Sequence, residues 1–372
     1  MNLAEAKQIE LAVSCQAANG PIDTRVSGTH DRVHAARPVH PSLERFYSYL
    51  DPIVPLLADP EVEEVMVNGP SEIFFERHGE IFRFDGAHLS ADCIRGAINV
   101  TSSVARTSVG LGNGASPLVS AHLDNLRVAA AIAPVALYGD CLCIRKHRRI
   151  KRGLMDYVQD GSFRHLLRRW ERPLPCFDKE AGERDIAEYF QRIMQRGTSV
   201  LISGTPSGGK STFLDMLVAL APARKRIVVI EDTHEIDPTV PNRLCLLANE
   251  EAGVSVRDLV KFALRARPDL LVIGEVRGAE AADFITAANS GPKAIASVHA
   301  DGPLDALRKL ESLALQTNEG MPHDALRRQI ASCIQIVVHF ARVDHLRVPV
   351  AALQVKGYED GQYQTEDIFV GH

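Results

Sequence analysis

A short stretch of the chain, GTPSGGKST at residues 204–212, combines glycines, hydroxyl side chains and a lysine. Its first eight residues match the pattern G-x-x-x-x-G-K-[ST], in which backbone N–H groups surround a phosphate group. The apolar run SVLISG (199–204) precedes it and a helical pattern follows it, so the positive end of a helix would face the same anion. The alternative is an ordinary glycine-rich turn, but the flanking strand and helix favour a phosphate-binding loop.

Within this loop, residue types have distinct expected parts in binding a nucleoside triphosphate. Gly204 is expected to let the chain turn, while Gly208 and Gly209 leave backbone N–H groups open to an anion. Lys210 is expected to reach the β- and γ-phosphates, and Ser211 to ligate Mg²⁺. The complete set of expected nucleotide-binding residues in the loop is Gly204, Thr205, Pro206, Ser207, Gly208, Gly209, Lys210, Ser211 and Thr212.

Two carboxylates and a histidine follow other apolar runs. Glu231 comes after RIVVI, Glu275 after LLVIG, and His299 ends SVH. The carboxyl ends of strands in an open parallel sheet meet beside the crevice where ligands bind. A carboxylate there can hold Mg²⁺ or orient the attacking water. We therefore predict that Glu231 and Glu275 hold Mg²⁺ together with Ser211, and that His299 senses the γ-phosphate. The alternatives are surface glutamates and a packing histidine.

The elements that must position these residues are strands and helices in alternation. Four runs that are apolar on both faces alternate with helical stretches, a pattern typical of a doubly wound α/β domain with a buried parallel sheet. The runs are 199–204, 225–232, 269–275 and 293–299, the helical stretches are 210–222, 256–267 and 278–290, and closing strands are expected at 334–343 and 348–370.

The earlier part of the chain predicts a smaller α+β domain. A helical pattern between residues 42 and 59 is broken at Pro52 and Pro55, and a turn is expected at residues 78–79 between two short strands. Further strands are expected at 126–134 and 141–147, with a helix near 93–105 before them. The fold class is therefore α/β, a C-terminal P-loop NTPase domain preceded by a smaller α+β domain.

These patterns divide the chain into four segments: a leader at 1–40, an α+β domain at 41–150, a basic linker at 151–182 and the ATPase domain at 183–372. The linker and the residues before it, RKHRRIKRG (145–153), are rich in arginine and lysine. They are interpreted either as a solvated connector or as groups that face phosphates or acidic lipid.

Composition narrows the class of protein. The chain has 372 residues, a formal net charge of −5 and seven cysteines without a CxxC pair, which favours a reduced cytosolic protein and argues against bulk binding to nucleic acid. Cys141 and Cys143 are interpreted as packing residues rather than metal ligands. The N-terminus does not have the pattern of a signal peptide, and no window of 18 apolar residues occurs, so any membrane association is expected to be peripheral.

Four boxes in order resemble those of the secretion ATPases of the type II/type IV secretion superfamily. They are GTPSGGKST, VVIEDTHEI (228–236), RARPDLLVIGEVRGAEAADF (265–284) and SGPKAIASVHADGP (290–303). The resemblance spans roughly residues 50–370. It implies a RecA-like ATPase domain, an ATP–Mg²⁺ site, a hexamer, an inner-membrane platform protein as partner, and a cytoplasmic location at the periphery of the inner membrane.

The resemblance also implies residue roles. Lys210 and Ser211 bind ATP–Mg²⁺, Glu275 activates the attacking water, Glu231 assists from the second box, and His299 reads the γ-phosphate. Together, Glu275, Glu231, His299 and Lys210 form the expected catalytic set.

Three arginines complete the resemblance, and one box departs from it. Arg127 in DNLRVA and Arg145 in CIRKH match arginines that clamp the nucleotide from the N-terminal domain of relatives, and Arg277 is expected near the phosphates or a subunit boundary. The last box usually begins TGH-x-G. Here Pro292 replaces the histidine and Lys293 follows it, which puts the role of that histidine in doubt.

The expected function is an ATP-hydrolysing motor for bacterial pilus assembly or type IV secretion of protein or DNA. The tail and the flank of the third box lean slightly to Flp-pilus assembly. One alternative is a RecA-like motor stimulated by nucleic acid, against which the acidic pI near 6.3 argues. The other is a nucleotide-binding scaffold subunit. No specific nucleic-acid partner is expected.

Overall fold

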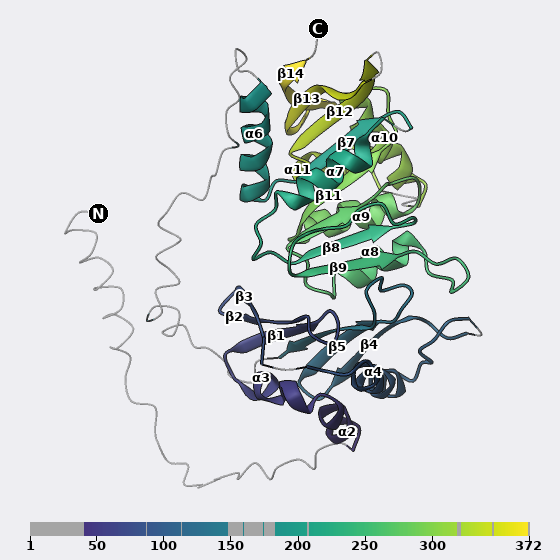
Figure 1. Ribbon diagram of the computed structural model, residues 1–372. Helices are drawn as coiled ribbons and strands as arrows, with labels where there is room; N and C mark the ends of the chain where they lie inside the picture. The colour runs from purple at the N-terminus through teal and green to yellow at the C-terminus, as the bar shows by residue number, and fades with distance from the viewer. Residues whose placement is uncertain are drawn as a thin grey trace, which may run out of the picture. The chain divides into compact units, whose positions relative to one another are not determined.

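The computed structural model describes residues 41–86, 88–112, 114–147, 183–206, 208–317, 321–343 and 346–370, together with residues 159 and 174 (Figure 1). The expected leader at 1–40, almost all of the expected linker at 151–182, and Ser207 lie outside the described residues. Over the part described, no helix is both long and apolar enough to cross a membrane.

The N-terminal part contains a six-stranded antiparallel sheet in the order β3-β2-β1-β6-β5-β4. The expected hairpin turn is confirmed at His78 and Gly79, which both have positive φ. The expected break in the first helix is confirmed as well, because α2 ends before the prolines, and Pro52 and Pro55 each lie in the first turn of a separate short helix. The elements are α2 Pro41–Tyr49, η2 Asp51–Ile53, α3 Val54–Ala58, β1 Val62–Val67, β2 Ile73–Arg77, β3 Glu80–Arg83, α4 Ala91–Ala105, β4 Leu118–Leu123, β5 Leu126–Ala131 and β6 Cys141–Lys146.

The two faces of this sheet bury different partners. Leu142 and Ile144 on β6 join the hydrophobic cluster that includes residues of α2 and α4. Cys141 and Cys143 alternate with them and join the cluster of the C-terminal part, as expected for successive residues of a strand. Both cysteines are buried free thiols, so their interpretation as packing residues is confirmed.

The C-terminal part contains an eight-stranded sheet in the order β14-β13-β12-β7-β11-β10-β8-β9. Strands β7 to β12 pair in parallel, and β13 and β14 add to them antiparallel. The closing strands expected in the tail are thereby confirmed. The sequence patterns did not predict β9 or three of the helices. The elements are α6 Glu183–Arg196, β7 Val200–Gly204, α7 Lys210–Ala219, β8 Ile227–Glu231, β9 Arg243–Leu247, α8 Val256–Ala263, β10 Leu270–Ile273, α9 Glu280–Asn289, β11 Lys293–Val298, α10 Pro303–Leu315, α11 His323–Cys333, β12 Ile336–Val343, β13 Leu346–Glu359 and β14 Gln362–Val370.

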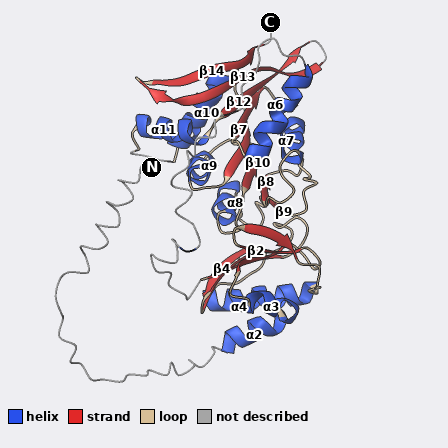
Figure 2. Ribbon diagram, turned by 90° about the vertical axis from the view of Figure 1, so that its left-hand side faces the viewer, coloured by secondary structure: helices blue, strands red, loops and turns tan. Residues whose placement is uncertain are grey.

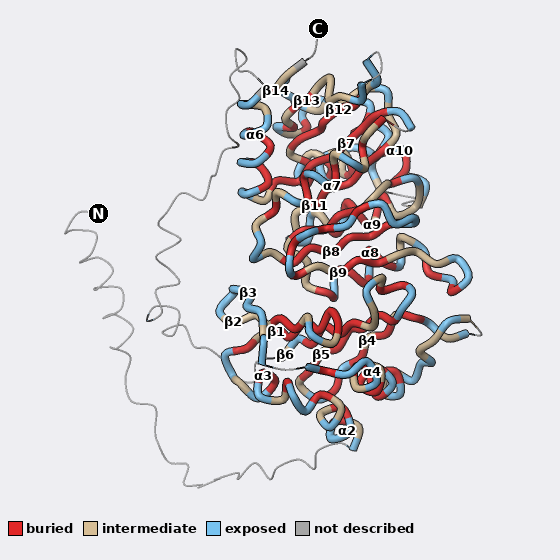
Figure 3. The backbone as a smooth tube through the Cα atoms, in the orientation of Figure 1, coloured by how far each residue is buried: buried red, intermediate tan, exposed pale blue. Residues whose placement is uncertain are grey.

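Helices cover both faces of the parallel strands, which confirms the doubly wound arrangement. Helices α8, α9, α10 and α11 lie on one side, and α6 and α7 on the other (Figure 2). On β8, Val228 and Ile230 face the first group while Ile227 and Val229 face the second. Strands β7, β8 and β10 are buried along their whole length (Figure 3), which is why they read as continuous apolar runs instead of alternating patterns.

A buried arginine joins the two sheets. The Arg226 side chain is fully buried and donates hydrogen bonds to Asn68 Oδ1 at 2.9 Å, Asn242 Oδ1 at 2.6 Å and the Ala266 carbonyl at 2.6 Å. Asn68 directly follows β1, whereas the other partners belong to the C-terminal part. A buried guanidinium is tolerated only when its donors are paired, and this network meets that requirement.

Candidate nucleotide site

The loop at 204–212 has the predicted position between a buried strand and a helix. It follows β7 and leads into α7, whose N-cap is Gly209 with φ 91°. Gly204 has φ 148°, and a Cβ there would lie 2.4 Å from the carbonyl oxygen of Phe340 on β12. The close approach of β12 therefore requires glycine at 204, a reason that the sequence does not reveal.

A cavity of about 380 Å³ opens beside this loop, at the carboxyl edge of β7, β8, β10 and β11. Gly204 and Thr205 line an adjoining cavity that shares Pro206 and His299 with it. Most of the predicted site residues meet in the first cavity: Pro206, Gly208, Gly209, Lys210, Ser211, Thr212, Glu231, Glu275, Arg277 and His299.

Lys210 is held at the centre of the site by oxygen and nitrogen acceptors. Its Nζ donates to the carbonyl oxygens of Gly204 at 3.1 Å and Thr205 at 2.9 Å, and lies 3.1 Å from His299 Nδ1. Burial lowers its pKa, because removing the ammonium from water disfavours the charged form. The ammonium is therefore costly to keep here and gains from an anionic partner.

Each oxygen of Glu275 has a nitrogen close by, but among the described residues only Oε2 accepts a hydrogen bond. Its Oε1 lies 2.7 Å from His299 Nε2, and its Oε2 accepts a hydrogen bond of 2.7 Å from Arg277. When Lys210 donates to His299 Nδ1, the ring proton belongs on Nε2, facing the carboxylate. Arg277 also donates to Asp232 at 2.7 Å, and its bond to Glu275 is the main cause that raises the pKa of the guanidinium. A chain of close contacts thus runs from Lys210 through His299, Glu275 and Arg277 to Asp232.

Glu231 ends β8 and is 3% exposed. Its Oε1 accepts hydrogen bonds from the backbone N–H groups of Glu235 at 3.0 Å and Ile236 at 3.1 Å. Its Oε2 is buried without a hydrogen-bond partner among the described residues, 3.5 Å from His234 Nδ1. Burial raises the pKa of this carboxyl. One oxygen therefore shapes the loop after β8, and the other remains available to a ligand.

Sequence reasoning missed part of the cavity wall. Asp232 and Glu235 add two carboxylates, and Arg347 on β13 adds a cation. Asp232 directly follows Glu231, so the strand-end argument that found Glu231 applies to it too. Arg347 has no comparable signal, because the antiparallel hairpin of β12 and β13 brings it to the loop.

The N-terminal arginines are not brought to this cavity. Arg145 lines a different cavity of about 820 Å³, at the amino edge of the same parallel strands. Arg127 is its cross-strand neighbour on β5 and lines neither cavity. Pro292 and Lys293 also line the larger cavity. The departure from the expected last box therefore lies at the start of β11, at the opposite end of that strand from His299.

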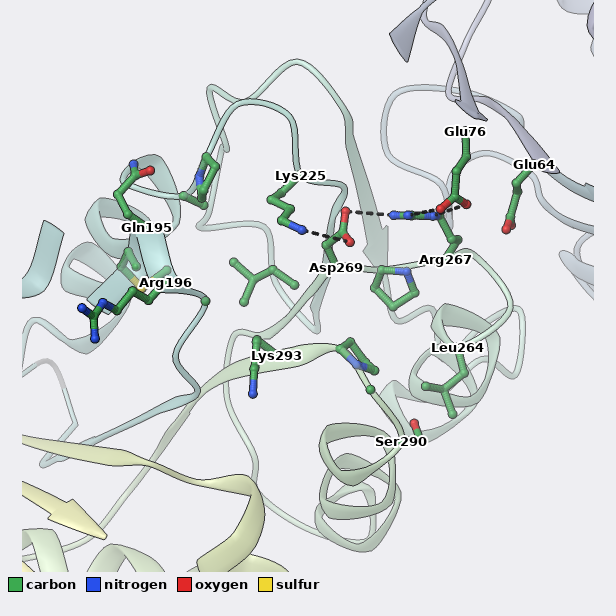
Figure 4. A pocket seen from close by; sticks show the side chains of 18 of the residues that line it. Glu64, Glu76, Gln195, Arg196, Lys225, Leu264, Arg267, Asp269, Ser290 and Lys293 are labelled. Carbon is green, nitrogen blue, oxygen red and sulfur yellow. Dashed lines mark hydrogen bonds and ion pairs between the residues drawn. The ribbon is translucent and has the colours of Figure 1, made fainter. Parts of the chain in front are cut away.

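The larger cavity is lined by paired charges. Arg267 donates to Glu76 at 2.6 and 2.8 Å and to Asp269 at 2.9 Å, and Lys225 lies 3.5 Å from the same aspartate (Figure 4). Glu64 points into the cavity apart from these pairs (Figure 4). It is 3% exposed, and burial raises its pKa to about 7.

Comparison with known proteins agrees with this geometry. A family model described as type II/IV secretion system protein matches residues 177–360. The type IV secretion system protein VirB11 of Brucella suis biovar 1 (strain 1330) is 30% identical over 309 residues, which cover 78% of this chain and 84% of the relative. A putative conjugal transfer protein of Mycobacterium tuberculosis (strain CDC 1551 / Oshkosh) is 29% identical over 333 residues, covering 85% and 86%.

A solved structure is similar over nearly the same extent. The crystal structure of the VirB11 ATPase from the Brucella suis type IV secretion system, in complex with sulphate, has a TM-score of 0.73 and 27% sequence identity, and the similarity covers 82% of this chain and 91% of that one. Both the α/β class and the order of a smaller N-terminal part before a P-loop part are thereby confirmed. The chain belongs to the type II/IV secretion system protein family and is one of its ATPases.

Proposed function

We propose that this protein is an ATP-hydrolysing motor subunit that powers a type IV secretion or pilus-assembly machine. The observation that carries the proposal is the phosphate loop at the start of α7, facing a cluster of carboxylates, a histidine and an arginine at the ends of β8, β10 and β11. Anion-binding N–H groups and hydrolytic side chains therefore meet in one cavity, as phosphoryl transfer to water requires.

The loop is suited to a triphosphate. The N-terminal turn of α7 presents unpaired backbone N–H groups and a positive dipole, and Gly208 and Gly209 keep side chains away from them. Lys210 bonds the loop's own carbonyls. A phosphate oxygen would replace these neutral acceptors and stabilise the ammonium, whose pKa burial lowers.

The oxygen groups of the site fit Mg²⁺. Ser211 supplies a hydroxyl, and Glu231 Oε2 is a buried carboxylate oxygen without a hydrogen-bond partner among the described residues. Mg²⁺ prefers oxygen ligands and retains waters, so few protein groups suffice beside the phosphates. Bound there, the ion would neutralise charge on the phosphate oxygens. We assign Ser211, Glu231 and Glu275 to this ion, directly or through water.

Hydrolysis then needs a base and a means to release it. Glu275 accepts a proton from the attacking water while oxygen bonds to the γ-phosphorus and the bond to the bridging oxygen of ADP breaks. In the arrangement described, Arg277 donates a hydrogen bond to one oxygen of Glu275, and His299 Nε2 lies 2.7 Å from the other. We infer that the γ-phosphate draws Arg277 and His299 toward itself, which frees one carboxylate oxygen for the water.

The wider assembly is proposed from the resemblance to the family. We propose that the chain acts in a homo-oligomeric ring, a hexamer, on the cytoplasmic side of the inner membrane, with a platform protein of the machine as partner. The machine that this motor drives serves Flp-type pilus assembly, conjugation or type IV secretion. The four segments expected from the sequence remain our proposed division of the chain.

A steady-state ATPase assay with Mg²⁺ tests the proposal. We expect turnover that depends on Mg²⁺ and does not rise when single-stranded DNA is added. Binding without any turnover would overturn the motor and favour a scaffold subunit. Stimulation by single-stranded DNA would favour a nucleic-acid motor instead.

A further inference from the structure

We propose that Arg347 on β13 is a nucleotide-binding residue of this site that contacts the α- and β-phosphates. The inference rests on the proposed function, because it adds a contact to the same cavity. It starts from the place of the side chain: Arg347 lines the cavity of the phosphate loop, although it comes from a hairpin that follows all four sequence boxes.

The position of the side-chain stem is defined by its contacts with the loop. A Cβ built on Gly209 would lie 3.1 Å from Arg347 Cβ, 3.6 Å from its Cδ and 3.9 Å from its Cγ. The stem therefore runs along the N-cap of α7. Because Gly209 has φ 91° and no side chain, the arginine can approach the backbone N–H groups that hold the α- and β-phosphates.

Arg347 is the cation of this cavity that is available to bind a ligand, because the other two are already bound to protein groups. Arg277 is bound to Glu275 and Asp232, and Lys210 is bound to backbone carbonyls and His299. Among the described residues, no carboxylate lies within ion-pair distance of the Arg347 guanidinium, and the residue is exposed. A guanidinium presents several donors in a fixed plane and binds phosphate oxygens in pairs.

The place beside Gly209 also decides which phosphates are contacted. The γ-phosphate side of the site is formed by Lys210, His299 and Glu275, which lie within direct contact of one another. A contact at the N-cap of α7 is instead made equally with ADP and with ATP. Arg347 is therefore a determinant of affinity for both nucleotides and not a sensor of hydrolysis.

Equilibrium titration of fluorescent ADP and of a non-hydrolysable ATP analogue tests this role in the full-length protein. For Arg347→Ala we expect about tenfold weaker binding of both nucleotides, the lower range for a hydrogen-bonded ionic contact that is open to solvent. Arg347→Lys keeps the charge without the planar donors, so we expect it to restore part of the affinity.

Arg342→Ala is the matched control, because Arg342 pairs directly with Arg347 across the β12–β13 hairpin and does not line the cavity. It should bind both nucleotides within about twofold of wild type. Equal affinities for Arg347→Ala and Arg342→Ala would overturn the inference, and so would a loss confined to the ATP analogue. Neither result touches the proposed function, which is tested separately by ATP turnover of the wild-type protein and its response to single-stranded DNA.

Discussion

The two ends of one parallel sheet carry two cavities of opposite character. At the carboxyl edge, the N-terminus of α7 opens into the cavity of the phosphate loop. At the amino edge, the larger cavity is lined by the C-terminal ends of helices, including Arg196 of α6, Leu264 after α8 and Ser290 after α9. Helix N-termini attract anions and C-termini attract cations. Only the smaller cavity is therefore built for a triphosphate.

This difference explains why basic residues gather at the amino edge without marking a phosphate site. Lys225 and Arg267 pair there with acidic side chains, and Lys293 begins β11 below them. These cations balance nearby carboxylates and helix C-termini. Cavity size is a poor guide here, because the helix ends that line the larger cavity are C-termini, which do not favour an anion.

The largest difference between the two ends is expected when the lysine at each end is replaced by alanine. Lys210→Ala removes the charge that holds the β- and γ-phosphates, so the turnover number for ATP should fall by about 10³-fold or more. Lys293→Ala changes a lysine at the amino edge and should stay within about twofold of wild type. Steady-state phosphate release measures both, and a comparable loss in the two variants would contradict the assignment of chemistry to one end.

A second large effect separates binding from chemistry within the smaller cavity. Glu275→Gln keeps the shape of the side chain but cannot accept the proton of the attacking water, so turnover should fall by about 10² to 10³-fold. Affinity for ADP should change little, because the loop is intact. Single-turnover kinetics with nucleotide titration gives both quantities. A near-wild-type rate would remove Glu275 from the role of base and shift attention to Asp232 and Glu235.

How much of this contrast could be predicted from the sequence depends on how far apart along the chain the contacting residues lie. Lys210 was found from the G-x-x-x-x-G-K-[ST] pattern. Glu275 and His299 were found because strand ends in a doubly wound sheet converge. Arg347 and the reason for glycine at 204 depend on the β12 hairpin beside the loop. Such contacts join residues far apart in the sequence, and no local periodicity reports them.

The same limit applies to the amino edge. The last box holds Pro292 and Lys293 together with His299, yet the first two lie at the start of β11 and His299 follows its other end. A motif that spans a whole strand joins two edges of the sheet that do not share a ligand. The buried Arg226 network between the sheets was not foreseen either, because an arginine next to a lysine in the sequence suggests a solvated turn.

A moderate effect on stability is expected from Glu64 at the amino edge. Burial raises its pKa from 4.5 to about 7, so between these pH values the folded protein binds more protons than the unfolded chain. Stability is therefore expected to decrease as pH rises through this window, by on the order of 3 kcal/mol in total. Glu64→Gln removes the titration. The stability of this variant relative to wild type should therefore be higher at pH 8 than at pH 5.

Thermal unfolding at several pH values measures this difference. Glu80→Gln is the control, because Glu80 is an exposed residue of β3, and it should follow the wild-type pH dependence. If Glu64→Gln and wild type kept the same separation from pH 5 to pH 8, the buried carboxyl at the amino edge would not titrate as expected. ATP affinity should be unaffected in either variant, since neither residue lines the smaller cavity.

The smallest effect is expected from Arg145→Ala. This variant tests most directly whether a residue at the amino edge takes part in nucleotide binding. The guanidinium lines the larger cavity and not the one that holds the phosphate loop, so ADP affinity should remain within about twofold of wild type. The family resemblance implies the opposite, that this arginine clamps the nucleotide. A tenfold loss in Arg145→Ala, without a matching loss of thermal stability, would mean that the N-terminal sheet reaches a nucleotide in another arrangement, either after a movement of the two parts or in a second copy of the chain. The nucleotide site would then be completed from outside the carboxyl edge.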